Sequence, residues 1–207
     1  MSTASLLRTV LLAVTFLSST ASIPLWAQWR VGVEVGGARF RGGSLDTEEQ
    51  TSFLPYRPTT FGAGLERQAG QYAFGLQVHY FQASLALEGP EVTISAEGVF
   101  KTVSISPEAV VRIATLGPGN QVRLHAGPVF EVWDIIDLGT RTRVGARGSV
   151  SLDVPLGARF SGVVAPGAAV TPSPYNEEEL GLGTGAPTFE RKTLWRGTLG
   201  LGLRYQL

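Results

Sequence analysis

The sequence predicts an all-β protein, an eight-stranded antiparallel up-and-down β-barrel, from three observations. In eight separate segments, apolar residues alternate with small or charged ones, as side chains do on the two faces of a strand. Glycine accounts for 26 of the 207 residues, and no long segment has the helical period. Short and long connections alternate between the segments, and an even number of strands places both ends of the sheet on the short-turn side.

The N-terminal residues 1–27 precede the first strand and are typical of a secretory signal peptide. Arg8 comes before an apolar run at 9–17, which is too short to span a bilayer and is followed by polar and small residues. Cleavage after Ala27 leaves a barrel domain of residues 28–207, and cleavage after Ala21 is the alternative. The chain has no cysteine, which excludes a disulfide-stapled secreted scaffold. Without residues 1–27 it has 16 basic and 17 acidic residues, so nothing in its charge predicts a nucleic-acid partner.

The first four predicted strands each have one apolar face, and glycine, serine and charged residues occupy the other. Their ranges are 29–38, 59–67, 72–82 and 99–114. Their apolar faces carry, in order, Val31, Val33 and Val35; Phe61, Ala63 and Leu65; Phe74, Leu76 and Val78; and Val103, Ile105 and Ala109. Alternation of this kind is the signature of a strand with two different faces.

The last four predicted strands repeat the pattern. Their ranges are 121–133, 142–156, 159–170 and 194–207. Their apolar faces carry, in order, Val122, Leu124 and Phe130; Val144, Val150 and Leu152; Phe160 and Val164; and Leu199, Leu201 and Leu203. The seventh strand has the least regular alternation, and we predict that Phe160 and Val164 share its apolar face.

The connections fall into two classes. Tight turns are expected at 68–70, 116–120 and 157–158, whereas the connections after the first, third, fifth and seventh strands are longer. This asymmetry is typical of a transmembrane barrel with short periplasmic turns and four extracellular loops. Apolar residues 53–56 in the first loop are expected to pack on another loop or to contact a partner. The loops are acidic but lack the spaced ligands of a calcium loop, so no metal site is predicted.

Aromatic residues at the strand ends favour a membrane barrel over a soluble lipocalin-like one, because bilayer interfaces attract two belts of rings. On the apolar face we expect Trp29, Tyr72, Phe160 and Tyr205 at the turn side, and Phe61, Tyr80, Phe130 and Trp195 at the loop side. These belts bracket an aliphatic band of the right length for tilted strands to cross a bilayer. The sequence therefore predicts a barrel in the bacterial outer membrane, surrounded by its lipids.

The other face is expected to fill the lumen with paired charges. The interior of an eight-stranded barrel is just wide enough for side chains, and an unpaired buried charge is costly. The predicted lumen charge network consists of Arg30, Glu34, Glu66, Glu108, Arg112, Arg123, His125, Glu131, Arg143, Arg147, Asp153, Arg196 and Arg204. We interpret it as a plug that closes the lumen.

This architecture resembles the small eight-stranded outer-membrane barrels of the OmpA/OmpX type over residues 28–207. The resemblance implies that the last strand carries a signal for the outer-membrane assembly machinery. Leu203, Tyr205 and Leu207 match its alternation, with Leu207 in place of the usual terminal aromatic residue.

The sequence favours a non-enzymatic, monomeric protein without cofactor, for envelope integrity or for contact with a surface partner through the loops. Three alternatives remain open. A lipid-modifying enzyme would use a histidine, and His79 with Ser84 is the pairing that can be constructed. A narrow conduit for solutes or lipids would use the lumen charges. A soluble lipocalin-like binding barrel would place the apolar face inside.

Overall fold

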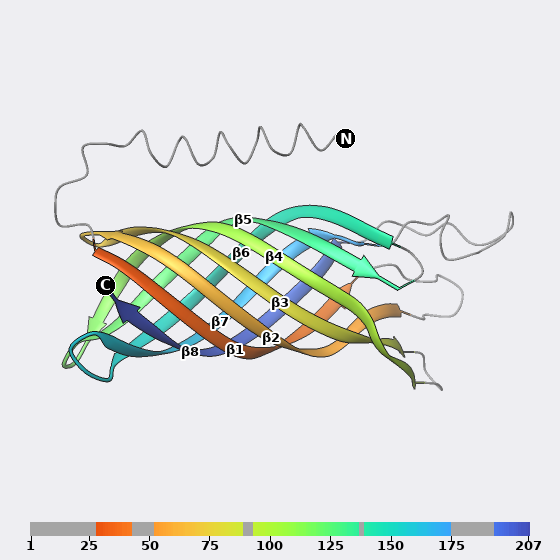
Figure 1. Ribbon diagram of the computed structural model, residues 1–207, viewed down its shortest axis with the longest axis horizontal. Coiled ribbons are helices and arrows are strands. Elements are labelled where there is room, and N and C mark those ends of the chain that lie inside the picture. Colours follow the sequence, from red (N-terminus) through yellow and green to blue (C-terminus); the bar gives the residue numbers. More distant parts are fainter. Residues whose placement is uncertain (1–27, 43–51, 89–92, 137–138, 175–192) are drawn as a thin grey trace, which may run out of the picture.

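The computed structural model describes residues 28–42, 52–88, 93–136, 139–174 and 193–207. They form a closed barrel in which every strand is antiparallel to its neighbours and β1 pairs with β8 (Figure 1). The strands are β1 (Gln28–Gly42), β2 (Ser52–Ala69), β3 (Tyr72–Glu88), β4 (Thr93–Leu116), β5 (Asn120–Ile135), β6 (Gly139–Pro155), β7 (Phe160–Pro172) and β8 (Thr193–Gln206). In the described part of the chain, no helix has the length and apolarity needed to cross a membrane. The predicted fold class is confirmed.

Several strands extend further toward the loop end than the sequence predicts. Residues 53–56, which we expected in the first loop, belong to β2, where Leu54 pairs with Ala86 of β3. The ladder between β3 and β4 likewise continues to the pair Glu88–Thr93. The loop prediction for residues 53–56 is therefore wrong, because antiparallel hydrogen bonding continues past the end of the regular alternation.

The three tight turns are confirmed, but not every loop-end connection is long. Residues 70–71, 117–119 and 156–159 join β2 to β3, β4 to β5 and β6 to β7. At the other end, β5 and β6 pair as far as Ile135 and Gly139, so only residues 136–138 lie between these strands. Gly139 has a φ of 77°, a conformation that glycine adopts without the strain caused by a Cβ atom. Strict alternation of short and long connections was thus a wrong prediction.

Two prolines interrupt the ladder between β4 and β5. The pairs Ile105–Phe130 and Ala109–Ala126 place Pro107 opposite Pro128, and neither proline has an N–H to donate. The hydroxyl of Ser106 donates a hydrogen bond of 2.8 Å to the carbonyl of Pro128 instead. A side chain thereby satisfies a backbone acceptor that the ladder leaves open.

We expect Ser106→Ala to lower the free energy of unfolding by about 1–3 kcal/mol, because the Pro128 carbonyl loses its donor inside the barrel wall. Urea unfolding of the barrel in lipid vesicles measures this change. Ser149→Ala is the matched control, since Ser149 is a buried serine whose side chain makes no hydrogen bond among the described residues. Equal losses in the two variants would contradict the role given to Ser106.

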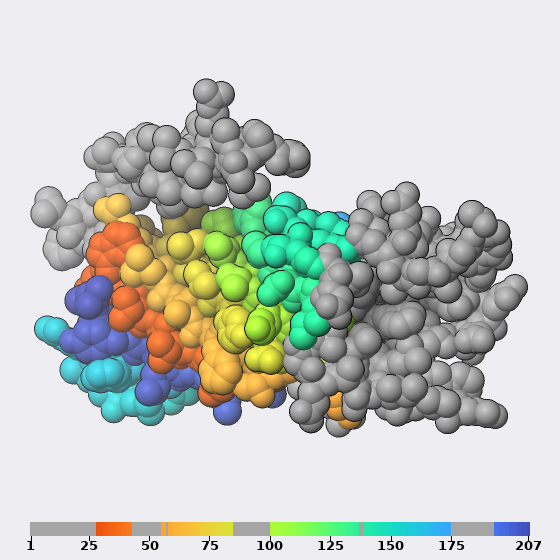
Figure 2. Space-filling model, turned by 45° about the vertical axis from the view of Figure 1, so that its right-hand side comes forward, coloured from red at the N-terminus to blue at the C-terminus, as the bar shows by residue number. Residues whose placement is uncertain are grey.

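The outer face of the barrel is apolar, and the lumen is polar. Val33 is 63% exposed on β1, and β8 presents Leu199, Leu201 and Leu203 in the same way. On β7, Val163 is 6% exposed and Val164 is 39% exposed, so the predicted phase of this strand is confirmed. Figure 2 shows the side chains of neighbouring strands packed into a continuous outer surface.

Candidate functional site: the closed lumen

Ion pairs fill the lumen from its middle to its turn end. Five carboxylates and five guanidinium groups take part among the described residues, together with two histidines. The carboxylates are Glu34, Glu66, Glu108, Glu131 and Asp153, and the guanidinium groups are Arg30, Arg123, Arg147, Arg196 and Arg204. Equal numbers of opposite charges compensate one another, which offsets the penalty of removing them from water.

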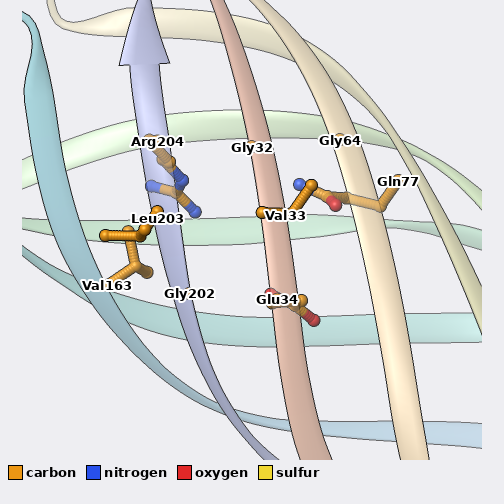
Figure 3. Close-up of a pocket in the computed structure, with 9 residues that line it drawn as sticks. All are labelled: Gly32, Val33, Glu34, Gly64, Gln77, Val163, Gly202, Leu203 and Arg204. Carbon is orange, nitrogen blue, oxygen red and sulfur yellow. The ribbon is translucent and has the colours of Figure 1, made fainter.

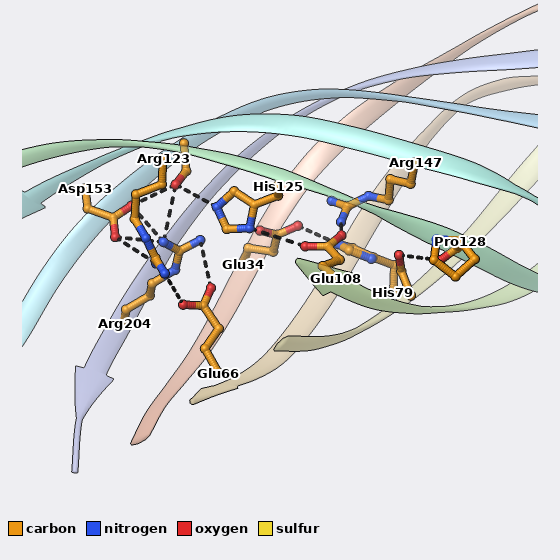
Figure 4. A network of polar contacts seen from close by, with 12 residues as sticks. Glu34, Glu66, His79, Glu108, Arg123, His125, Pro128, Arg147, Asp153 and Arg204 are labelled. Carbon is orange, nitrogen blue, oxygen red and sulfur yellow. Dashed lines mark hydrogen bonds and ion pairs between the residues drawn. The ribbon is translucent and has the colours of Figure 1, made fainter. Parts of the chain in front are cut away.

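The group nearest the turns is built around Asp153 of β6. Arg204 of β8 donates to both Asp153 carboxylate oxygens at 2.7 Å, and Arg123 of β5 lies 3.4 Å from Oδ2 (Figure 4). Arg123 also reaches Glu66 at 2.7 Å, and Arg30 approaches Asp153 at 3.9 Å. Side chains from five strands thus meet across the lumen.

The middle group is built around Glu108 of β4. Its carboxylate pairs with Arg147 of β6 and lies 3.3 Å from Nδ1 of His125. His125 Nε2 is 3.0 Å from the hydroxyl of Ser151, which donates to Asp153 Oδ1 at 3.0 Å. The middle and turn-end groups are therefore connected by hydrogen bonds.

The order Ser151, His125, Glu108 has the connectivity of a hydrolytic triad, but the setting does not suit catalysis. Ser151 is fully buried, and its hydroxyl already contacts Asp153 and Arg204. A nucleophile needs space for the reacting atom of its substrate. The cavity found in the lumen has none of the three residues in its lining.

His79 of β3 pairs with Glu34 of β1, with 2.6 Å between Nε2 and Oε1. Gly62 of β2 lies between the two strands, where a Cβ atom would be 2.5 Å from Glu34 Cγ and 2.9 Å from His79 Cδ2. The structure does not bring His79 to Ser84, because five residues of extended strand separate them by about 16 Å. The pairing considered for a lipid-modifying enzyme is therefore absent.

We expect Gly62→Val to lower the free energy of unfolding by about 1–3 kcal/mol, because the new side chain displaces the Glu34–His79 pair. Gly148→Val serves as the control in the same urea titration. A Cβ atom at Gly148 would meet only the His125 carbonyl oxygen, at 3.7 Å. Gly148→Val introduces the same valine, with the same preference for β-strands, but without a clash. A loss of stability in both variants would therefore contradict the packing argument.

Aromatic residues close the loop end of the lumen. This ring cluster consists of Phe40, Phe81, Phe100 and Trp133, with the ring of Trp133 5.6–6.4 Å from the other three. Trp133 Nε1 donates to Glu131 Oε2 at 3.1 Å, and Arg196 pairs with Glu131 at 2.7 Å. Arg196 also lies over the ring of Phe81, so it joins the ring cluster to the charged lumen below.

Sequence reasoning missed the ring cluster, although the strand phase contains the signal for it. Phe81 follows the inward-facing His79 by two positions, and Trp133 follows Glu131 in the same way. Residues two apart on a strand share a face. Extending the inward phase to the loop end would have placed these rings in the lumen.

Two predicted members of the lumen charge network lie outside it. Arg143 donates to the backbone carbonyls of Ser173 and Pro174, at 2.9 and 3.2 Å, and thereby holds the chain that leaves β7. Arg112 is half-buried near the turn end of β4, and its side chain makes no ion pair with the described residues. The other eleven members take part in the ion pairs above.

A small cavity lies in the lumen. It lies between Glu34, Gln77 and Arg204, beside Gly32, Gly64 and Gly202 (Figure 3). Its volume of about 10 Å³ is about what one water molecule needs. Within the described ranges, no three histidine or acidic side chains are grouped in a way that could hold a metal ion.

The rings predicted for the aromatic belts point away from the lumen. Seven are exposed on the outer face: Trp29, Phe61, Tyr72, Tyr80, Phe130, Phe160 and Trp195. Tyr205 is half-buried and packs on Phe160, with 4.9 Å between ring centroids. The predicted assembly residues Leu203 and Leu207 are exposed on the same face.

A row of polar residues follows the apolar band on the outer face near the loop end. Register partners form an apolar row of Val35, Phe61, Tyr80, Val103 and Val132. Two positions closer to the loop end on β2 to β5 lie polar residues that, together with Thr140 of β6, form a second row. This polar row consists of Thr59, Gln82, Lys101, Asp134 and Thr140. Polar residues next to an apolar band are typical of the boundary between hydrocarbon and headgroups.

Solved structures share the closed barrel fold. OprG, an outer membrane protein from Pseudomonas aeruginosa, has a TM-score of 0.55 and 12% identity, over 87% of this chain and 95% of that one. The chain has the fold of the small eight-stranded outer-membrane barrels. Neisserial surface protein A has a TM-score of 0.54 and 12% identity, over 86% of this chain and 97% of that one. The sequence matches no protein-family model and no curated protein.

Proposed function

We propose that this protein is an integral barrel of the bacterial outer membrane, without enzymatic activity and with a lumen closed to solutes. The proposal rests on the distribution of apolar and charged side chains between the outer face and the lumen. Apolar side chains such as Val33 and Leu201 are exposed on the outside, whereas the charges are buried and paired inside. A soluble ligand-binding barrel requires the opposite distribution.

Two layers in series support a closed lumen. The ring cluster occupies the loop end, and the ion pairs around Glu108 and Asp153 occupy the middle and the turn end. The cavity beside Glu34 and Arg204 has room for about one water molecule. We expect no conductance steps when the purified protein is added to a planar lipid bilayer, and stepwise conductance would contradict closure.

The role that suits a closed barrel is structural: it supports the envelope and displays its loops at the cell surface. The fold is shared with the outer membrane protein OprG and with Neisserial surface protein A. The outward Leu203, Tyr205 and Leu207 fit recognition of the last strand by the assembly machinery. We expect the protein to fractionate with the outer membrane as a monomer, and to require detergent for extraction.

We expect Val33→Arg to destabilise the barrel in phosphatidylcholine vesicles by about 2–4 kcal/mol, because Val33 faces the middle of the bilayer. Urea unfolding measures the effect. Gln82→Arg is the matched control, since Gln82 is an outward residue of the polar row and should change stability by less than about 1 kcal/mol. If both substitutions are tolerated alike, as on the surface of a soluble protein, the membrane assignment is wrong.

A further inference from the structure

Among the described side chains, four arginines lie on the outer face near the strand ends, and they differ in their partners. At the turn end, Arg67 lies over the ring of Trp29, 5.7 Å from its centroid, and Arg159 donates to the Tyr205 hydroxyl at 3.2 Å. At the loop end, Arg39 and Arg41 of β1 are exposed and have no partner among the described side chains. No acidic side chain of the described residues therefore forms an ion pair with either member of the loop-end pair.

The backbone places this arginine pair just beyond the apolar band. Arg39 and Arg41 alternate with the inward Ala38 and Phe40, so both point away from the lumen. The ladder between β1 and β2 ends at Gly37 and Thr59, and both arginines come after Gly37, toward the loop end. The pair thus lies at the level expected for lipid headgroups, given the proposed membrane orientation.

The neighbouring strands provide apolar surface beside the arginine pair. Arg41 is the register partner of Trp195, which is 55% exposed, and tryptophan is favoured at membrane interfaces. Arg39 is the partner of Gly197, which in turn pairs with Ala168 of β7. A Cβ atom at Gly197 would meet only the Arg39 carbonyl oxygen, at 4.0 Å, so the outer surface at this glycine has room for another molecule to pack closely.

We propose that Arg39 and Arg41 bind the phosphate of an anionic lipid in the loop-side leaflet, with the acyl chain against Trp195 and Gly197. Side chains two apart on a strand are about 7 Å apart at their Cα atoms, so both guanidinium groups can reach one phosphate. Arginine presents a planar set of N–H donors that matches phosphate oxygens. Charge complementarity therefore selects the occupant, and the site rests on the proposed membrane function.

Lys101 provides an internal comparison on the outer face near the loop end. It is an exposed cation of the polar row, but its register partner on the next strand is an acidic residue, Asp134, so the two positions together have no net charge. Lys101 should therefore attract an anionic headgroup less than the arginine pair does.

The test compares wild type, the double variant Arg39→Gln/Arg41→Gln, and the control Lys101→Gln in detergent with equal phosphatidylglycerol and phosphatidylcholine. Native mass spectrometry measures the lipid retained on the folded barrel. Wild type should retain phosphatidylglycerol preferentially. The double variant should lower its affinity for this lipid about 30-fold, since each arginine near a lipid surface accounts for about fivefold. Lys101→Gln should stay within about twofold of wild type.

Heat-dependent gel mobility, recorded for every variant after reconstitution, separates the outcomes. If the wild type folds and inserts but shows no preference for phosphatidylglycerol, the lipid site is wrong and the membrane barrel still stands. The same conclusion follows if the preference survives in the double variant. If Lys101→Gln loses the preference for phosphatidylglycerol to the same extent, the lipid site is also wrong, because the preference would then come from the general positive charge of the surface. A wild-type protein that does not insert into vesicles overturns both proposals.

Discussion

Replacing Glu108 by alanine should lower the free energy of unfolding by about 3–5 kcal/mol, because Arg147 then remains as a buried charge without its partner. His125 loses a neighbour in the same step, since its Nδ1 lies 3.3 Å from Glu108. The measurement is the urea-dependent equilibrium between folded and unfolded protein in vesicles, read by tryptophan fluorescence. A loss of this size is expected only if Glu108 belongs to a packed network.

Two further variants separate the charge from the packing. Glu108→Gln keeps the shape of the side chain and should lose less stability than Glu108→Ala. Adding Arg147→Ala to Glu108→Ala should recover part of the loss, because no unpaired charge then remains. If Glu108→Ala instead leaves stability unchanged and opens conductance in a planar bilayer, the charges line a path for ions and the plug interpretation is wrong.

Trp133→Ala should lower the free energy of unfolding by about 3–5 kcal/mol, because it removes the central side chain of the ring cluster. The indole is fully buried and contacts Phe40, Phe81 and Phe100, so these three rings would face a cavity. Glu131 would also lose the hydrogen bond from Trp133 Nε1. The same urea titration measures the effect.

Trp133→Phe isolates the hydrogen bond, since it retains most of the ring packing. Its expected loss is about 1.5–3 kcal/mol, the range for a hydrogen bond to a charged group. Neither Trp133 variant should conduct ions, because the ion pairs below still fill the lumen. Conductance after Trp133→Ala would show that the ring cluster alone closes the barrel.

Much of the fold follows from local sequence pattern. The side-chain period of a strand is two, so alternation alone identifies the lumen face and the outer face. Phe160 and Val164 were placed correctly on the outer face of β7 in this way, and eleven of the thirteen predicted lumen charges take part in ion pairs. Strand ends were predicted less well, because paired strands such as β3 and β4 extend beyond the regular alternation.

The sequence by itself determined the number of strands, their faces and the polarity of the barrel, because these depend on neighbours along the chain. Only the tertiary structure decided which charges meet. His79 pairs with Glu34, which lies 45 residues away, and Glu108 pairs with Arg147 from another strand. Such contacts depend on the register of every intervening strand, which is set by the closure of β1 on β8. The ring cluster has the same origin, because its four members come from β1, β3, β4 and β5 and meet only across the closed lumen.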